Sequence, residues 1–143
     1  MKGFIAPVLI FALSIGSALA DDVIAQRRAL MKANGDSTKA MVAILKGAPY
    51  DDAAVKAALK TYTEAAEKMP ALFPPDSKTG GDTAALPAVW ENKADFDARL
   101  AKFGKDAAAA AGSITDAASF KANMTGVLKN CSECHETYRA KKG

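Results

Sequence analysis

The most constraining feature of this sequence is the run Cys-Ser-Glu-Cys-His at residues 131–135, close to its C-terminal end. Two cysteines separated by two residues and followed by histidine form the C-x-x-C-H pattern to which haem c is attached. Each thiol can add to one vinyl group of the same haem, and the adjacent imidazole can then bind the iron. The motif predicts one covalently attached haem c per chain, held by Cys131 and Cys134 with His135 as an axial ligand.

The second axial position of this iron is the open question, because His135 is the single histidine of the chain. The remaining choices are a methionine, a weaker side chain, water or no ligand. A filled position is typical of an electron carrier, whereas an open one suits a protein that binds small gases. A peroxidase is a poor alternative, because the usual distal acid–base histidine is missing.

The cysteine pair has two alternative roles, a structural disulfide and a thioredoxin-like redox site. An exported chain with an even number of cysteines can form a structural disulfide. A thioredoxin-like redox site would follow a strand in a βαβ context, and no segment here has a strand pattern. The histidine directly after Cys134 favours haem attachment over both.

The N-terminal segment has the three parts of a signal peptide. Lys2 is followed by an apolar run at residues 4–15, and Ala18-Leu19-Ala20 has the small residues that signal peptidase accepts. A membrane anchor is disfavoured because the run is short and contains Pro7. We expect cleavage after Ala20, a domain at residues 21–143 and export to the bacterial periplasm, which suits the cysteine motif because its resemblance to haem c attachment sites implies that haem is added outside the cytoplasm.

The length and charge of the chain suit one domain without nucleic acid or membrane partners after cleavage. The sequence has 19 basic and 16 acidic residues, and removing Lys2 with the leader leaves a formal charge of +2. Nucleic-acid-binding proteins have clustered basic residues interleaved with aromatic ones, whereas the lysines here are scattered. The expected partner is a redox protein, whose identity a near-neutral surface does not indicate.

Apolar residues recur at helical spacing in four segments. The first helix is expected over about residues 23–46, with Met31 on its inward stripe. The second follows a cap at Asp51 or Asp52 and ends near Met69. A connection over residues 70–87, rich in proline and glycine, leads to the third helix.

The third helix is expected to start at Pro87 or Trp90 and to stop at Gly112 and Ser113. The fourth is capped by Thr115 or Asp116 and carries the cysteine motif. We therefore predict an all-α fold, an antiparallel four-helix bundle with a covalently attached haem. Three other methionines are expected to fill the core rather than bind iron, namely Met41, Met69 and Met124.

With these features the chain resembles the cytochrome c′ family over its whole length after the leader. The markers are Arg27 four residues before Met31, the Leu-Phe-Pro turn at residues 72–74, Trp90 at the start of the third helix and the motif region 131–139. Ordinary small cytochromes c place the motif near the N-terminus instead. The resemblance implies an exported bundle with the haem held by the fourth helix.

The same resemblance implies which residue faces the second axial position. In high-spin family members an apolar or aromatic residue of the first helix leaves the iron five-coordinate and reactive toward NO and CO. In the low-spin branch, typified by cytochrome c-556, a methionine binds the iron, and residues 27–35 resemble this branch with Met31 at the ligand position. A shift by one residue would place Leu30 there instead, but the spacing from Arg27 favours Met31.

Three arginines are candidates for contacts with the haem. Arg27, one turn before Met31, is expected to bind a haem propionate, and Arg28 is a weaker candidate. Arg139 lies one turn after His135, where the resemblance implies a basic residue beside the imidazole. It would also complement the helix dipole.

These inferences predict a periplasmic monohaem electron-transfer protein, not an enzyme, with His135 and Met31 as axial ligands. The alternative is a high-spin cytochrome c′ that binds NO or CO. In an intermediate case, Met31 binds the iron weakly and a small ligand displaces it. Members of the resembled family form dimers through the first two helices, but the exposed faces here are mostly polar, so the sequence leaves open whether two copies pair as a homodimer.

Overall fold

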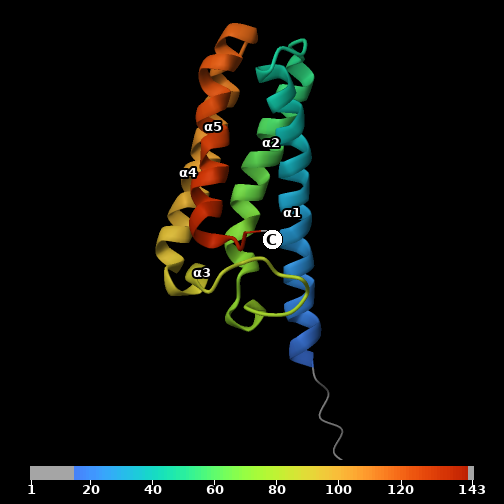
Figure 1. Cartoon of the computed structure of the whole chain (residues 1–143), viewed down its shortest axis with the longest axis vertical. Helices are drawn as coiled ribbons and strands as arrows, with labels where there is room; N and C mark the ends of the chain where they lie inside the picture. Colours follow the sequence, from blue (N-terminus) through green and yellow to red (C-terminus); the bar gives the residue numbers. More distant parts are fainter. Residues whose placement is uncertain (1–14, 142–143) are drawn as a thin grey trace, which may run out of the picture.

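The computed structural model describes residues 15–141, with side chains from residue 19 onward. Four long helices form an antiparallel bundle: α1 (Ile15–Leu45), α2 (Asp52–Lys68), α4 (Lys93–Ser113) and α5 (Ala117–Tyr138) (Figure 1). The described residues contain no strand, so the predicted all-α bundle is confirmed. No helix among them is long and apolar enough to cross a membrane. Residues 1–14 of the expected leader lie outside the described residues, and cleavage after Ala20 stays a prediction.

The helix starts follow the caps expected from the sequence. Asp51 accepts a hydrogen bond from the backbone N–H of Ala54 at 3.0 Å and starts α2. Asp116 and Ser119 cap each other's backbone N–H groups at the start of α5 in a capping box. Of the paired candidates in the sequence, Asp51 and Asp116 are therefore the N-caps.

Two helix boundaries differ from the expectation. α1 already includes residues 15–22, so the helix extends N-terminal of the expected start near residue 23. The expected third helix is broken at Asn92 into the short α3 (Ala88–Glu91) and α4. The reason lies in Trp90, whose indole N–H donates to the carbonyls of Phe73 and Pro74 at 3.0 and 3.1 Å and ties α3 to the preceding loop.

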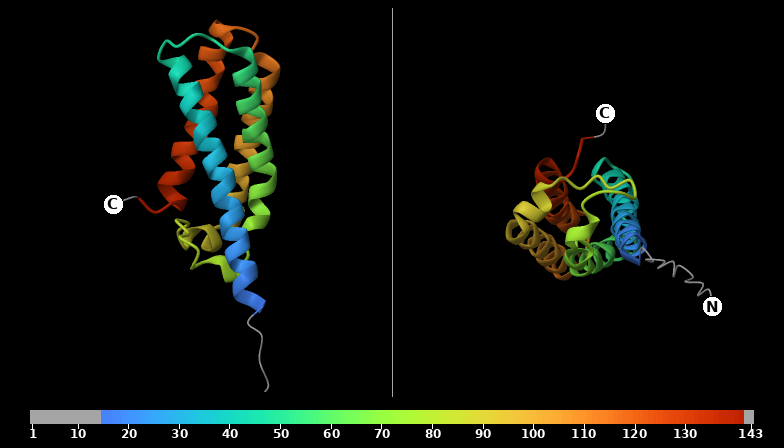
Figure 2. Two further views of the ribbon diagram at one scale, coloured as in Figure 1. Left: turned by 90° about the vertical axis from the view of Figure 1, so that its right-hand side faces the viewer. Right: turned by 90° about the horizontal axis from the view of Figure 1, so that it is seen from below.

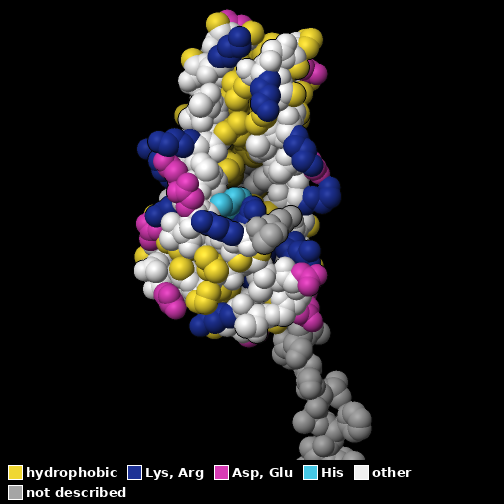
Figure 3. Space-filling model, in the orientation of Figure 1, with side chains coloured by type: hydrophobic (Ala, Val, Ile, Leu, Met, Phe, Trp, Pro, Cys, Tyr) yellow, Lys and Arg dark blue, Asp and Glu magenta, His cyan; other side chains and the backbone are white. Residues whose placement is uncertain are grey.

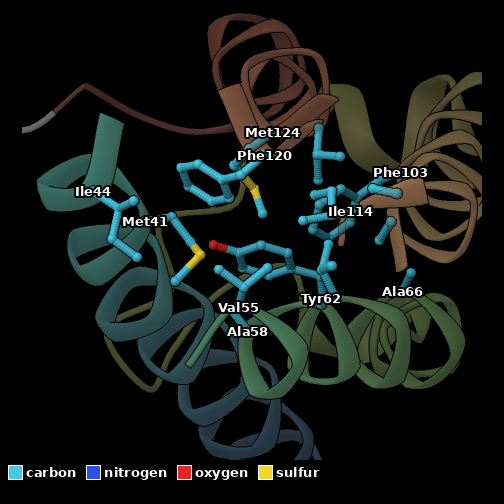
Figure 4. Close-up of a cluster of buried hydrophobic side chains, with 14 residues drawn as sticks. Met41, Ile44, Val55, Ala58, Tyr62, Ala66, Phe103, Ile114, Phe120 and Met124 are labelled. Atoms are coloured by element: carbon cyan, nitrogen blue, oxygen red, sulfur yellow. The ribbon is translucent and has the colours of Figure 1, made fainter. Parts of the chain in front are cut away.

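The interior divides into two groups of buried side chains along the bundle. The first, the Tyr62 core, lies between the four long helices, with Tyr62 pointing between Met41 and Met124 (Figure 4). Burial raises the pKa of Tyr62 to about 12. The second, the Phe73 core, lies at the other end and comprises Met69, Phe73, Val89, Phe96, Leu100 and Tyr138. The prediction that Met41, Met69 and Met124 are core residues is confirmed.

Two glycines lie where neighbouring elements are in close contact. A Cβ atom on Gly104 of α4 would lie 2.9 Å from the Cβ of Ala66 on α2. A Cβ on Gly81, whose φ is +50°, would lie 2.9 Å from a methyl carbon of Ile24 on α1. Any larger residue at either position would push two elements apart.

The long connection between α2 and α4, residues 69–92, crosses the lower end of the bundle (Figure 2). It contains two short 3-10 helices, η1 (Met69–Leu72) and η2 (Pro75–Ser77), as well as α3. Two backbone hydrogen bonds join it to the chain at the end of α5: Leu86 donates to Tyr138 at 2.9 Å, and Ala140 donates to Ala84 at 2.8 Å. We call this segment the crossover.

Candidate functional site

A two-part cavity lies between α1 and α5. Its larger part has a volume of about 340 Å³ and its smaller part about 150 Å³. Five residues line both parts and make them one site: Met31, Leu100, Cys134, His135 and Arg139. Cys131 lines the larger part, so the structure places all three residues of the cysteine–histidine motif in one cavity. The smaller part borders the Phe73 core, and the larger part reaches toward the Tyr62 core.

The two cysteines and the histidine project from the last turns of α5 and are partly exposed. Burial raises the pKa of both thiols. Burial lowers the pKa of His135, and the nearby guanidinium of Arg139 lowers it further. Figure 3 shows the single histidine at the surface with basic side chains beside it. A neutral imidazole is the form that binds a metal ion.

Arg139 lies beside this imidazole, as the resemblance implied. Its Nη1 is 3.4 Å from Nδ1 of His135. The residue is exposed and follows the last residue of α5, so it also lies at the negative end of the helix dipole. The two expected roles are compatible with one position.

Met31 approaches the motif from α1, across the cavity. Its side chain is 37% exposed, which is unusual for a large apolar residue in this protein. The helical stripe predicted an inward position, and the exposure arises because that position opens into the cavity. The alternative residue, Leu30, packs against the Phe73 core and does not line either part of the cavity.

Arg27 is buried, with 4% of its surface exposed, and it binds the crossover. Its Nη1 donates to the carbonyl of Leu72 at 3.0 Å and to Oγ of Ser77 at 2.9 Å. Its Nη2 donates to the carbonyl of Ser77 at 2.9 Å and to Oγ1 of Thr83 at 2.5 Å. The guanidinium also lies 4.5 Å from the ring centroid of Phe73. This role cannot be predicted from the sequence, because the acceptors are mostly loop atoms far along the chain.

The charge of Arg27 has no anionic partner among the described residues, since all four acceptors are neutral and no carboxylate lies within salt-bridge distance. Burial lowers the pKa of its guanidinium. Arg27 also lines the smaller part of the cavity. A buried cation without a counterion fits an anionic group bound in that cavity.

The end of α5 is fixed to α4 by a second polar network. The hydroxyl of Tyr138 donates to Asp95, which also accepts from Nε of Arg99 at 2.8 Å. The Nη1 of Arg99 donates to the carbonyl of Glu133 at 2.9 Å. The hydrogen bond from Tyr138 holds the pKa of Asp95 below its ordinary value. The helical spacing of Met124, Val127, Cys131 and Tyr138 indicates an inward position for Tyr138, but it gives no signal for the partner of its hydroxyl.

Asn34 lies one helical turn after Met31 and lines the larger part of the cavity. It is 8% exposed, and its Oδ1 atom has no hydrogen-bond partner. The next polar residue on this face, Thr38, is hydrogen-bonded to the hydroxyl of Tyr62 at 2.9 Å. Asn34 carries no signal in the sequence, because a polar residue on a helix gives no sign that it is buried.

Taken together, the cavity suits a flat apolar group with acidic edges. Two thiols and an imidazole line one wall, a thioether lies on the facing helix, and a buried cation lines one end. Porphyrin carboxylates would supply the missing charge beside Arg27, and the vinyl groups would meet the thiols.

The family model, the related sequences and the solved structures that match this chain all point to one family. The family model described as cytochrome c′ matches residues 22–139. The cytochrome c′ of Rhodopseudomonas palustris is 54% identical over 132 residues, which cover 91% of this chain and 90% of the relative. A cytochrome c-556 of Agrobacterium fabrum is 42% identical over 144 residues, covering 99% and 97% of the two chains. The solved structure of R. palustris cytochrome c′ superposes with a TM-score of 0.83 at 55% identity, covering 85% of this chain and 98% of that one.

Proposed function

Because this chain belongs to the cytochrome c′ family and carries one covalently attached haem c, we propose that it transfers electrons through a low-spin haem with His135 and Met31 as axial ligands. The observation that carries the proposal is that these two residues, from antiparallel helices, line both parts of one cavity. The haem would supply a one-electron iron couple when bound. The chain supplies the two ligands, the two thioether bonds and the packing around them.

Each cysteine would form its bond by adding S–H across one vinyl double bond, which requires no oxidant. The residues of α5 that would do this project from one helical face, three residues apart. The network of Tyr138, Asp95 and Arg99 would keep His135 in place by fixing the end of that helix. A rigid ligand set keeps the structural change on reduction small.

Arg27 would serve both the crossover and the cofactor. Its four hydrogen bonds hold the loop against α1, and a propionate at the same cavity end would neutralise its charge. The prediction of a propionate contact stays a prediction, and it gains support from the missing counterion.

The second candidate function is a five-coordinate haem that binds NO or CO. Two observations favour it: the relative at 54% identity bears the name cytochrome c′, and Met31 is more than one third exposed. In that case the thioether would pack beside the iron without a bond. Neither function requires an enzyme active site.

The location and partners are also proposed. Cleavage after Ala20 would release the domain into the bacterial periplasm, where a redox protein would be its partner. Pairing of two copies stays a prediction that the sedimentation of the holoprotein would test.

Optical and EPR spectra of the ferric and ferrous holoprotein would test the ligand assignment. We expect a low-spin ferric signal with a methionine-to-iron charge-transfer band, lost in Met31→Ala and retained in the control Leu30→Ala. A high-spin spectrum that is unchanged in Met31→Ala, with ready CO binding, would contradict the proposal and favour the gas-binding alternative. Loss of the band in Leu30→Ala alone would move the ligand position by one residue.

A further inference from the structure

A polar group without a partner lies on the Met31 side of the cavity. Asn34 is more than nine-tenths buried. Its Oδ1 atom nevertheless accepts no hydrogen bond. Burying an amide oxygen without a hydrogen-bond partner costs free energy. A buried amide is therefore expected where a ligand or a water molecule supplies the missing hydrogen bond.

The other polar side chains that line the larger part of the cavity have partners. Thr38 is bonded to Tyr62, and Asn130 donates to Asp106 at 2.9 Å while accepting from Lys102 at 3.1 Å. Arg99 is held by Asp95 and by a backbone carbonyl. Asn34 therefore differs from its polar neighbours, because its inward oxygen has capacity to spare.

The position of Asn34 relates it to the second axial site. It follows Met31 by three residues, so the two side chains lie on one face of α1 and line the same part of the cavity. A carboxamide carries two N–H donors beside its oxygen, and a half-turn about its last torsion exchanges them. The amide can therefore present either a donor or an acceptor at this place.

We infer that Asn34 hydrogen-bonds a small diatomic ligand that takes the place of the Met31 thioether. With the amide turned by the half-turn described above, an N–H group takes the place of Oδ1 and donates to the outer atom of that ligand. The inference rests on the proposed haem site, and it adds a specificity-determining residue on α1. An apolar residue at this position would leave such a ligand without a polar contact on that face.

The test uses the holoprotein in two backgrounds, the natural sequence and Met31→Ala, each with Asn34→Leu. The infrared C–O stretch and the CO dissociation rate of the ferrous protein are measured. We expect Asn34→Leu to shift the stretch to higher frequency and to speed CO dissociation about fivefold, the factor that one ordinary hydrogen bond supplies. The matched control is Asn123→Leu, a partly buried asparagine of α5 that lines a groove elsewhere on the bundle and should change neither value.

Several outcomes would overturn the inference. An unchanged stretch and dissociation rate in the Met31→Ala background would exclude a contact between Asn34 and the ligand. A changed reduction potential with an unchanged CO complex would assign the amide to the thioether instead. If the natural protein proves high-spin, the proposed ligation fails, but the CO measurements in that background still decide the role of Asn34. If Asn34→Leu does not fold, Asn34→Ala provides the same comparison.

Discussion

Arg27 shows how one buried charge can organise a loop. It lies on α1, yet its hydrogen bonds go to residues 72, 77 and 83 of the crossover. The rings of Phe73 and Trp90 flank the guanidinium, with centroids 4.5 and 5.7 Å from its central carbon. Planar stacking and a rigid fork of donors suit arginine and would not suit lysine.

Replacing Arg27 by methionine should lower the free energy of unfolding of the holoprotein by at least about 2 kcal/mol, because hydrogen bonds from a charged donor to buried acceptors are lost. Denaturant unfolding followed by circular dichroism measures this change. The control Arg28→Met should stay within about 0.5 kcal/mol, because Arg28 is exposed and only weakly paired with Asp82. If the two substitutions lowered the free energy of unfolding equally, Arg27 would not have the stabilising role described here.

Single residues mark the boundary of what the sequence predicts. The motif residues 131, 134 and 135 could be assigned from spacing alone, and the structure brings them into one cavity. The partners of Arg27 could not be assigned, because loop carbonyls carry no sequence signal. The missing hydrogen-bond partner of Asn34 could not be predicted either, because it depends on which side chains the neighbouring helices bring near it.

At the scale of elements, α5 is the platform of the site and is fixed at both ends. Its start is set by the capping box of Asp116 and Ser119, and its end by the hydrogen bond from Tyr138 to Asp95. Since α1 runs antiparallel to it (Figure 1), residues ascending α1 meet residues descending α5. This arrangement places Met31 near the level of Cys134 and His135, and Asn34 near that of Cys131.

Removing the cap with Asp116→Ala should cost about 1 kcal/mol of stability, because a backbone N–H at the helix start loses its acceptor. The visible spectrum of the holoprotein should not change, because the cap and the cavity lie at opposite ends of α5. Thermal or denaturant unfolding gives the first value and absorption the second. Glu67→Ala, at an exposed helical position, is the control and should leave stability nearly unchanged. A spectral change in Asp116→Ala would contradict this separation.

The break between α3 and α4 shows where element prediction fails. Apolar spacing continues from Val89 to Phe96 and on to Phe103, so one continuous helix is the natural expectation. The backbone turns at Asn92 instead, with φ of −123° and ψ of 46°. The indole of Trp90 bonds to crossover carbonyls, a tertiary contact that periodicity does not contain.

At the scale of the molecule, the bundle has a closed half and a half built around the cavity. The Tyr62 core packs side chains from all four long helices. The Phe73 core is smaller and borders the cavity, with the crossover covering it. We therefore expect the closed half to be stable without the group that fills the cavity, and the other half to depend on it.

Protein without attached haem, made with Cys131→Ser and Cys134→Ser, should keep the closed half and lose order in the other. We expect amide hydrogen exchange to stay slow around Tyr62 and Met124 and to become fast over residues 69–92, because the crossover loses its support. Exchange measured against the holoprotein gives this comparison residue by residue. Uniform acceleration along the whole chain would show that the two halves unfold together.

The crossover has a consequence for the movement of the bundle. It is bound to α1 through Arg27 and to the end of α5 through residues 84 and 86, so it bridges the two helices that form the walls of the cavity. A group that fills the cavity would contact both of these walls, so the bridge and the bound group would each restrict the movement of the other. Haem attachment would therefore also stiffen the bundle, because it would limit the relative movement of α1 and α5.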